Sequence, residues 1–294
     1  MNQNNNSKTT CPLCQSPQNL EFEKVQSFGY PIVYYQCQQC GFVFQNAGES
    51  ESTNPKFYEE TYRKIYQFSE SPTEKDLKIQ QKRAQGTLDF LIRQGVQKLE
   101  GVLDIGASSG LLLKTLRKAF TDNVVGVEPG RAYREFAQLD GLNMYASLEE
   151  LEKEPQRKPF DLISLMHVLE HIPEPVKLLT NLRTNHLLPS GYLLIEVPNF
   201  YAHDSYELAH VSCFTPHSLK ETFQKAGFKI IAMEKHGHPR SKLLNLYITV
   251  LAKVGVEEPG YKVKPEKLVR ERRHLGFLYR RLVLKFLPKL AWLD

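Results

Sequence analysis

The sequence predicts a Rossmann-like α/β fold, with a seven-stranded, mostly parallel sheet and helices on both of its faces. Short apolar segments alternate with helix-type patterns over residues 75–254, which is the order of βαβ units and of a parallel sheet. The first of these segments runs directly into a loop with two glycines. At 294 residues the chain can hold one such domain with a small addition at each end.

The elements can be placed in chain order from their patterns. An apolar stripe within residues 73–99 predicts an amphipathic helix before the sheet. A Leu-Pro-Ser-Gly sequence at 188–191 predicts a turn that leads into a strand. The predicted strands are 101–105, 124–128, 143–145, 160–165, 192–197, 228–234 and one within 243–253, with helices at 110–119 and 131–139.

Two C-x-x-C pairs at the N-terminus are typical of a metal site. Cys11 and Cys14 form one pair, and Cys37 and Cys40 form the other. Zn²⁺ prefers four thiolates in a tetrahedron, and each pair can supply two of them from one tight turn. We therefore predict a zinc ribbon within residues 1–50, with two redox pairs or two disulfides as the alternatives. Cys213 stands alone, which favours a core position.

The first strand and the loop after it indicate a nucleoside site. Asp104 ends the strand, and Gly106 and Gly110 let the backbone approach a ligand closely. Glu128 ends the next strand, where a carboxylate can accept both ribose hydroxyls. The loop lacks the glycine pattern that holds a pyrophosphate, and it lacks the Gly-Lys-Ser/Thr of a P-loop. The pattern therefore suits a nucleoside without phosphates.

In this loop and in the later segments Phe160–Ile163, His167–His171 and Leu188–Leu193, the chain resembles class I methyltransferases that use S-adenosylmethionine (SAM). The resemblance covers residues 75–254 and implies SAM as the cofactor and an antiparallel seventh strand. A dinucleotide dehydrogenase is the alternative, but the third loop glycine is missing. The implied cofactor-binding residues are Asp104, Gly106, Gly110, Glu128, Ser147, Leu148, Met166 and His167.

The segment 206–216 follows the fifth predicted strand and would cover the side of the crevice opposite SAM. Here the chain resembles zinc-ribbon methyltransferases that act on sugars, in which a Glu-His pair lies in this loop. His210 matches the histidine, Ala209 replaces the glutamate, and the second half of the C-methyltransferases is missing. The resemblance therefore implies O-methylation of a sugar, nucleotide sugar or glycan, with His210 and Tyr206 as catalytic residues.

Other interpretations of the chemistry stay open. His203 and His217 are further imidazole candidates, and His167 and His171 have a spacing that can bind metal, although the sequence offers no evident third ligand. His167 is more simply a structural residue beside SAM. The chain could also methylate a quinone-like or natural-product hydroxyl, or it could be a SAM-binding or zinc-ribbon adaptor without catalysis.

The flanking segments are harder to interpret. Residues 51–74 are rich in Phe and Tyr, which suits either a helix packed on the core or a lid over the ligand. In the tail, 255–294, an apolar helical stripe among basic residues suits docking on the core or on a second subunit, with an anionic membrane surface as the alternative. The stripe consists of Leu268, Leu275, Leu278, Leu282, Phe286 and Leu290.

The charge of the chain is concentrated in this tail. From Val256 onward there are ten Lys and Arg against five Asp and Glu, whereas the preceding 255 residues hold 28 of each sign. A neutral catalytic body disfavours nucleic acid as a partner, because such enzymes neutralise phosphates over a broad basic face. The polar start of the chain carries no apolar leader, so we expect a cytoplasmic protein.

Overall fold

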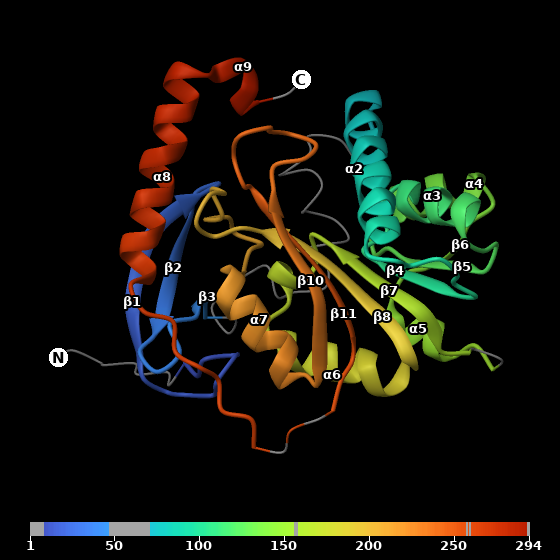
Figure 1. Ribbon diagram of the computed structural model, residues 1–294, viewed down its shortest axis with the longest axis horizontal. Coiled ribbons are helices and arrows are strands. Elements are labelled where there is room, and N and C mark those ends of the chain that lie inside the picture. The colour runs from blue at the N-terminus through green and yellow to red at the C-terminus, as the bar shows by residue number, and fades with distance from the viewer. Residues whose placement is uncertain (1–8, 47–70, 156–157, 257, 259, 293–294) are drawn as a thin grey trace.

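The computed structural model describes residues 9–46, 71–155, 158–256, 258 and 260–292 (Figure 1). A seven-stranded sheet forms its centre, in the order β10-β11-β8-β7-β4-β5-β6. The strands β4 to β8 pair in parallel, and β11 runs antiparallel to both β8 and β10. The predicted fold and the antiparallel seventh strand are confirmed. The strands are β4 (Val102–Ile105), β5 (Val124–Val127), β6 (Asn143–Tyr145), β7 (Phe160–Met166), β8 (Leu187–Pro198), β10 (Phe228–His236) and β11 (Tyr247–Val254).

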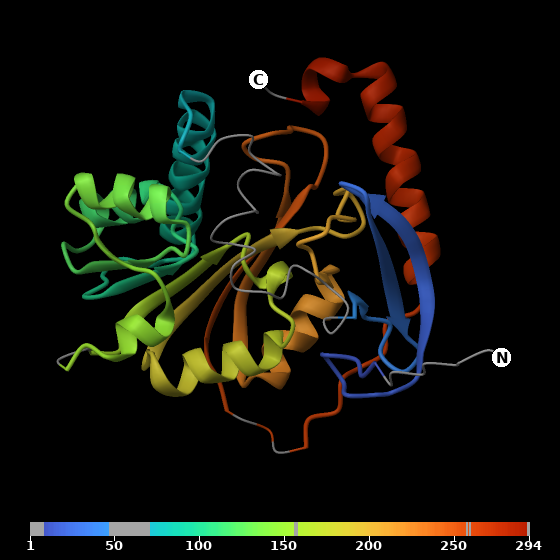
Figure 2. The ribbon, with the colours of Figure 1, turned by 180° about the vertical axis from the view of Figure 1, so that it is seen from behind.

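Helices cover both faces of this sheet, as the alternating pattern predicts. One face packs against α2 (Glu74–Arg93), α3 (Leu111–Ala119) and α4 (Arg131–Leu139). The other packs against α5 (Leu148–Glu152), α6 (Pro175–Asn185) and α7 (Pro216–Lys225), with α5 and α6 plainly visible from behind in Figure 2. Since the strands are buried on both sides, they consist of nearly continuous apolar runs.

Two local predictions need correction. The helix predicted over 73–99 ends at Arg93. The turn predicted at 188–191 is assigned to β8, which begins at Leu187, but it is an irregularity within that strand: Leu187 pairs with Phe160 of β7, and the next pair is Tyr192 with Leu162. A third local feature had no sequence signal: His167 has a left-handed φ of 58°, and a 3₁₀ turn, Leu169–His171, follows it. The aromatic residues of the predicted lid lie outside the described residues.

The N-terminal segment forms a second, smaller sheet that is joined to the main domain. Its strands are β1 (Asn19–Ser27), β2 (Tyr30–Cys37) and β3 (Val43–Gln45). A short strand of the main domain, β9 (Ser212–Cys213), pairs with β3 and extends this sheet. Cys213 is a buried core residue there, as predicted. The cysteine turns also pack into the main apolar core.

The tail forms α8 (Val269–Phe286) and α9 (Pro288–Ala291), and α8 lies along the small sheet in both views (Figures 1 and 2). The predicted stripe does not face the core, because its six members are 39% to 66% exposed. The helix packs through Val269, Arg273 and Val283 instead. The guanidinium of Arg273 stacks 4.1 Å from the ring centre of Phe200, and Gly276 closely approaches the carbonyl of Tyr201. A helical wheel that counts apolar residues misses a face built on a stacked arginine and a glycine.

No helix among the described residues is both long enough and apolar enough to cross a bilayer. The exposed stripe of the tail therefore leaves contact with a membrane surface or a second subunit as a prediction.

Candidate functional site

A cavity of about 520 Å³ opens at the carboxyl ends of β4, β5, β6 and β7. This is the edge where open α/β sheets bind their ligands. Gly106 and Gly110 shape the loop after β4, with φ of 74° and 72°. A Cβ on Gly106 would lie 2.4 Å from a methyl of Val168, and one on Gly110 would lie 2.3 Å from a methyl of Leu142. The two glycines are therefore required by both backbone conformation and close packing.

Glu128 follows β5 and lines the cavity with a carboxylate that the backbone holds in place. Its Oε2 accepts a hydrogen bond from the amide of Ser108 at 2.8 Å, and its Oε1 accepts one from the amide of Gly130 at 2.8 Å. Each carboxylate oxygen has further lone pairs, so the group can still accept bonds from a ligand. The loop and the acidic residue thus form one preorganised unit.

Asp104 is buried beside this unit, and Ser164 donates a hydrogen bond of 2.7 Å to its Oδ1. Burial raises the pKa of Asp104 to about 7, and the charge of Glu128 adds to this effect. The group can therefore change its protonation state near neutral pH.

His167 is fixed between two buried carboxylates on the opposite wall of the cavity. Its Nε2 lies 3.0 Å from Glu196 and its Nδ1 lies 3.3 Å from Glu170. Burial and the charge of Arg83 oppose protonation, but the two carboxylates raise the pKa of His167. Glu196 also accepts from Thr249 at 2.9 Å and lies 3.1 Å from the Nε of Arg83. Burial opposes the ionised form of Glu196, yet bonds from His167 and His236 hold its pKa well below the usual range.

All but one of the predicted cofactor-binding residues line the cavity. Gly110 does not, and serves instead to start α3 against Leu142. Arg83 of α2 also lines the cavity, and sequence reasoning missed it. Its guanidinium is the only Lys or Arg group among the described lining residues, so it is the natural partner for a ligand carboxylate.

His171 is the imidazole that connects the cavity to the loop of His210. His171 lines the cavity, and its ring centre lies 5.0 Å from that of His210. His210 is 6% exposed and is not part of the described cavity wall. Burial lowers the pKa of His171, and burial together with the charge of His171 lowers the pKa of His210 to about 3. Both rings are therefore neutral at pH 7, which is the form of imidazole that binds a metal.

The carboxylate beside His210 comes from Glu207, three residues earlier in the chain. Oε2 of Glu207 lies 3.6 Å from Nε2 of His210. Burial and the charge of Glu170 raise the pKa of Glu207 to about 7. Sequence reasoning noted that Ala209 cannot supply a carboxylate but did not identify Glu207, whose i, i+3 spacing was the available signal.

Tyr206, the other predicted catalytic residue, does not line the cavity. Its ring packs against Tyr34 and Phe200 and under the guanidinium of Arg273, and it lines a second hollow beside α8. The ring of His203 contacts the ring of Tyr247. Nε2 of His217 lies 2.8 Å from the carbonyl oxygen of Lys264. The described structure does not bring these three side chains together with His210 at the cavity.

The small N-terminal sheet holds the loop of His210 in place. The hydroxyl of Tyr34 lies 2.9 Å from the carbonyl of Glu207 and accepts from its amide at 3.1 Å. The side-chain amide of Gln45 donates to the carbonyls of Glu207 and His210, both at 2.8 Å. Tyr34 and Gln45 are therefore positioning residues for this loop.

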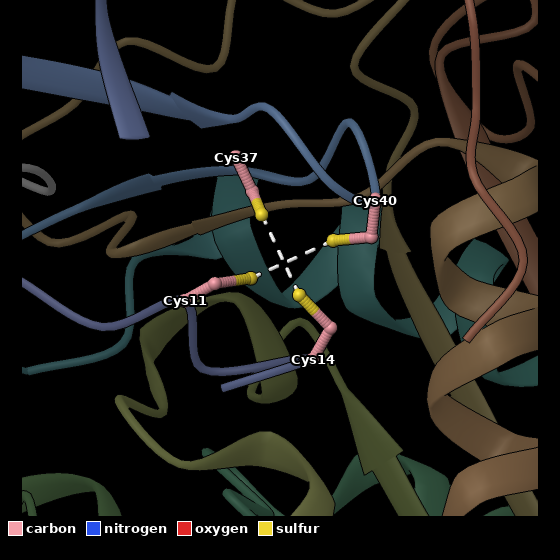
Figure 3. A group of neighbouring side chains, drawn as sticks. All are labelled: Cys11, Cys14, Cys37 and Cys40. Atoms are coloured by element: carbon pink, nitrogen blue, oxygen red, sulfur yellow. Dashed lines mark hydrogen bonds between the residues drawn. The ribbon is translucent and has the colours of Figure 1, made fainter. Parts of the chain in front are cut away.

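The four cysteines of the predicted ribbon point toward one centre (Figure 3). The sulfur atoms of Cys11 and Cys40 are 3.6 Å apart, and those of Cys14 and Cys37 are 3.4 Å apart. Zn–S bonds of about 2.3 Å in a tetrahedron place sulfurs ~3.8 Å apart, so this set fits a zinc ion after a small expansion. None of the cysteines forms a disulfide, which disfavours that alternative.

Replacing Cys37 with serine should abolish zinc binding and weaken methyl transfer more than SAM binding. The reason is that β2 and β3, which flank the turn of Cys37 and Cys40, carry Tyr34 and Gln45 to the loop of His210. Metal analysis and calorimetry with SAM measure both effects, and Cys213→Ala is the matched control that should retain zinc. Finding no zinc in wild-type protein purified without chelator would rule out the ribbon.

Residues 77–233 match the family described as a methyltransferase domain. The ubiquinone biosynthesis O-methyltransferase of Hahella chejuensis is 31% identical over 99 residues, which is 31% of this chain and 41% of that protein. The protein of the same name from Actinobacillus pleuropneumoniae is 32% identical over 124 residues, 38% of this chain and 52% of that one. The chain thus spans about half the length of the curated relatives it matches. A SAM-dependent methyltransferase structure from Archaeoglobus fulgidus aligns with 62% of this chain and 100% of that one, at 20% identity and a TM-score of 0.47.

Proposed function

The chain belongs to the methyltransferase-domain family, and from this premise we propose that it transfers the methyl group of SAM to a hydroxyl oxygen of a small molecule. The observation that carries the proposal is the carboxylate of Glu128, held by two backbone amides at the mouth of a glycine-shaped loop. This arrangement suits a ribose with both hydroxyls free.

In this proposal SAM lies along the carboxyl edge of the sheet. Glu128 accepts its ribose hydroxyls, and the turn at Ser147 and Leu148 borders its adenine. Arg83, across the cavity, pairs with its amino-acid carboxylate. The methyl group then faces the wall that carries His167 and His171.

The imidazoles of His171 and His210 supply the base. The acceptor's hydroxyl gives its proton to this pair, and the oxygen lone pair forms a bond to the methyl carbon. The carbon–sulfur bond breaks at the same time, and its electrons stay on sulfur as the thioether S-adenosylhomocysteine. Holding the oxygen in line with that bond supplies much of the rate, and the base supplies a further part.

A quinone-like or other small aromatic hydroxyl compound is the better-supported acceptor. The curated relatives are named for ubiquinone biosynthesis, which favours this class over the sugar or glycan that the sequence suggested. The cavity beside His171 also has an apolar wall of Val168, Ile172 and Leu178, which suits a flat ring.

A sugar hydroxyl is the second candidate, because the small N-terminal sheet contacts the loop of His210. These contacts lie partly outside the 77–233 match, so they are an addition to the methyltransferase domain of the family. They agree with the resemblance to zinc-ribbon sugar methyltransferases.

A methyl-transfer assay with two acceptor panels tests the proposal. Methyl-labelled SAM is incubated with the protein and either catechols and hydroxyquinols or nucleotide sugars, and products are identified by mass and NMR. We expect an O-methyl ether in the aromatic panel. Transfer only to nucleotide sugars would favour the second candidate, and a new carbon–methyl bond would contradict O-methylation.

A further inference from the structure

Three side chains with metal-binding atoms meet beside the cavity, and they are distant in the sequence from the four cysteines. Glu170 and His171 belong to the 3₁₀ turn after β7, and His210 comes from the loop before β9. One ligand atom from each lies within 4.8 Å of the other two. The sequence offered no third ligand for His171, and the fold supplies it from 39 residues downstream.

Two of the three side chains have buried atoms without a hydrogen bond among the described residues. Both carboxylate oxygens of Glu170, which is 2% exposed, lack a hydrogen bond within the described part of the chain. The Nδ1 of His210 lacks one as well. His167 approaches Oε1 of Glu170 from one side, with its Nδ1 at 3.3 Å. Buried polar atoms are nearly always bonded, so the unbonded Nδ1 of His210 beside this carboxylate points to a ligand between them.

The two histidines are oriented as metal ligands usually are. Nδ1 of His171 lies 2.8 Å from the carbonyl of Ala209, and only a protonated nitrogen can bond there, so Nε2 is the unprotonated nitrogen of the neutral ring. His210 presents Nε2 to the carboxylate of Glu207 at 3.6 Å, which leaves Nδ1 for an ion. A carbonyl or carboxylate on the far nitrogen is the usual support of a ligating histidine.

We propose that Glu170, His171 and His210 bind one divalent transition-metal ion at the cavity wall. Two imidazoles and a carboxylate suit Zn²⁺, Co²⁺ or Fe²⁺, with bonds of about 2.0–2.2 Å for zinc. Because His171 lines the cavity, the ion would lie next to the space assigned to the acceptor. There it would hold the acceptor's hydroxyl oxygen and lower its pKa, in place of the proton transfer to the imidazoles described above. This role rests on the proposed function, whereas binding of the ion does not.

Cobalt titration of the full-length protein, loaded with one zinc per chain so that the cysteine site is filled, tests the second site. Co²⁺ bound by nitrogen and oxygen shows visible d–d absorption without the thiolate charge-transfer band that Co²⁺ in the cysteine site would show. We expect one additional Co²⁺ per chain with the first type of spectrum. Glu170→Gln and His210→Asn should each weaken its binding at least tenfold, because each removes one of three ligands.

The controls separate binding from folding and from catalysis. Glu174→Gln and His217→Asn replace the same residue types outside the group and should leave cobalt binding unchanged. SAM binding, measured on every variant, reports that the cavity is still folded. If wild-type protein binds no cobalt beyond the cysteine site, or if Glu170→Gln and His210→Asn bind it as wild type does, the proposal is wrong. Since no acceptor is needed, either result is independent of whether methyl transfer occurs.

Discussion

Replacing Glu128 with alanine should weaken SAM binding by about 2–4 kcal/mol, or roughly 30- to 1,000-fold in Kd. The variant loses the charge-assisted bonds to both ribose hydroxyls in a site that is 3% exposed. It also frees the amides of Ser108 and Gly130, which the carboxylate holds in position. Calorimetric titration of SAM into the two proteins measures the change.

Two control variants make this result interpretable. Glu128→Gln keeps the shape and one acceptor oxygen, so its loss should be smaller than that of alanine. Glu135→Ala removes an exposed carboxylate on α4 and should bind SAM as wild type does. Unchanged SAM affinity in Glu128→Ala, with an unchanged melting temperature, would defeat the assignment of the ribose site.

Replacing His210 with alanine should lower kcat by about 10²–10⁴-fold with little change in SAM affinity. The ring lies against His171 on the acceptor side, away from Glu128 and the glycine loop. The remaining activity should rise with pH, because hydroxide then takes over the removal of the acceptor's proton. Steady-state kinetics over a pH series with the best acceptor from the panels measure both effects.

His217→Ala is the matched control, because its ring contacts a backbone carbonyl away from the cavity. Parallel loss of SAM binding and activity in His210→Ala would make His210 a structural residue. A near-normal kcat would instead leave positioning of the acceptor as the main source of the rate.

The fold and the SAM side of the site could be predicted because their signals are local. Asp104, Gly106 and Glu128 stand at the ends of apolar strands, and parallel strands bring such ends to one edge. The four cysteines were predictable for the same reason, since each pair lies within one turn. Arg83 was missed because a basic residue on an amphipathic helix has the pattern of a solvent-facing side chain.

The acceptor side could not be predicted, because it is assembled from distant parts of the chain. Tyr34 and Gln45 reach the loop of His210 across more than 160 residues, and nothing in either segment marks the contact. Glu170 lies in the segment 167–171, which resembles class I methyltransferases. Its proposed role as a metal ligand depends on His210, which lies in another loop. The packing face of the tail helix was predicted wrongly for a different reason, since that face is built on Arg273 and Gly276 rather than on leucines.

The most direct test of the central claim is a calorimetric titration of the wild-type protein with SAM, S-adenosylhomocysteine and NAD. We expect saturable binding of one SAM per chain, binding of S-adenosylhomocysteine at the same site, and no heat from NAD. Binding of NAD with no binding of SAM would contradict it, because the loop after β4 would then hold a pyrophosphate rather than a methyl donor.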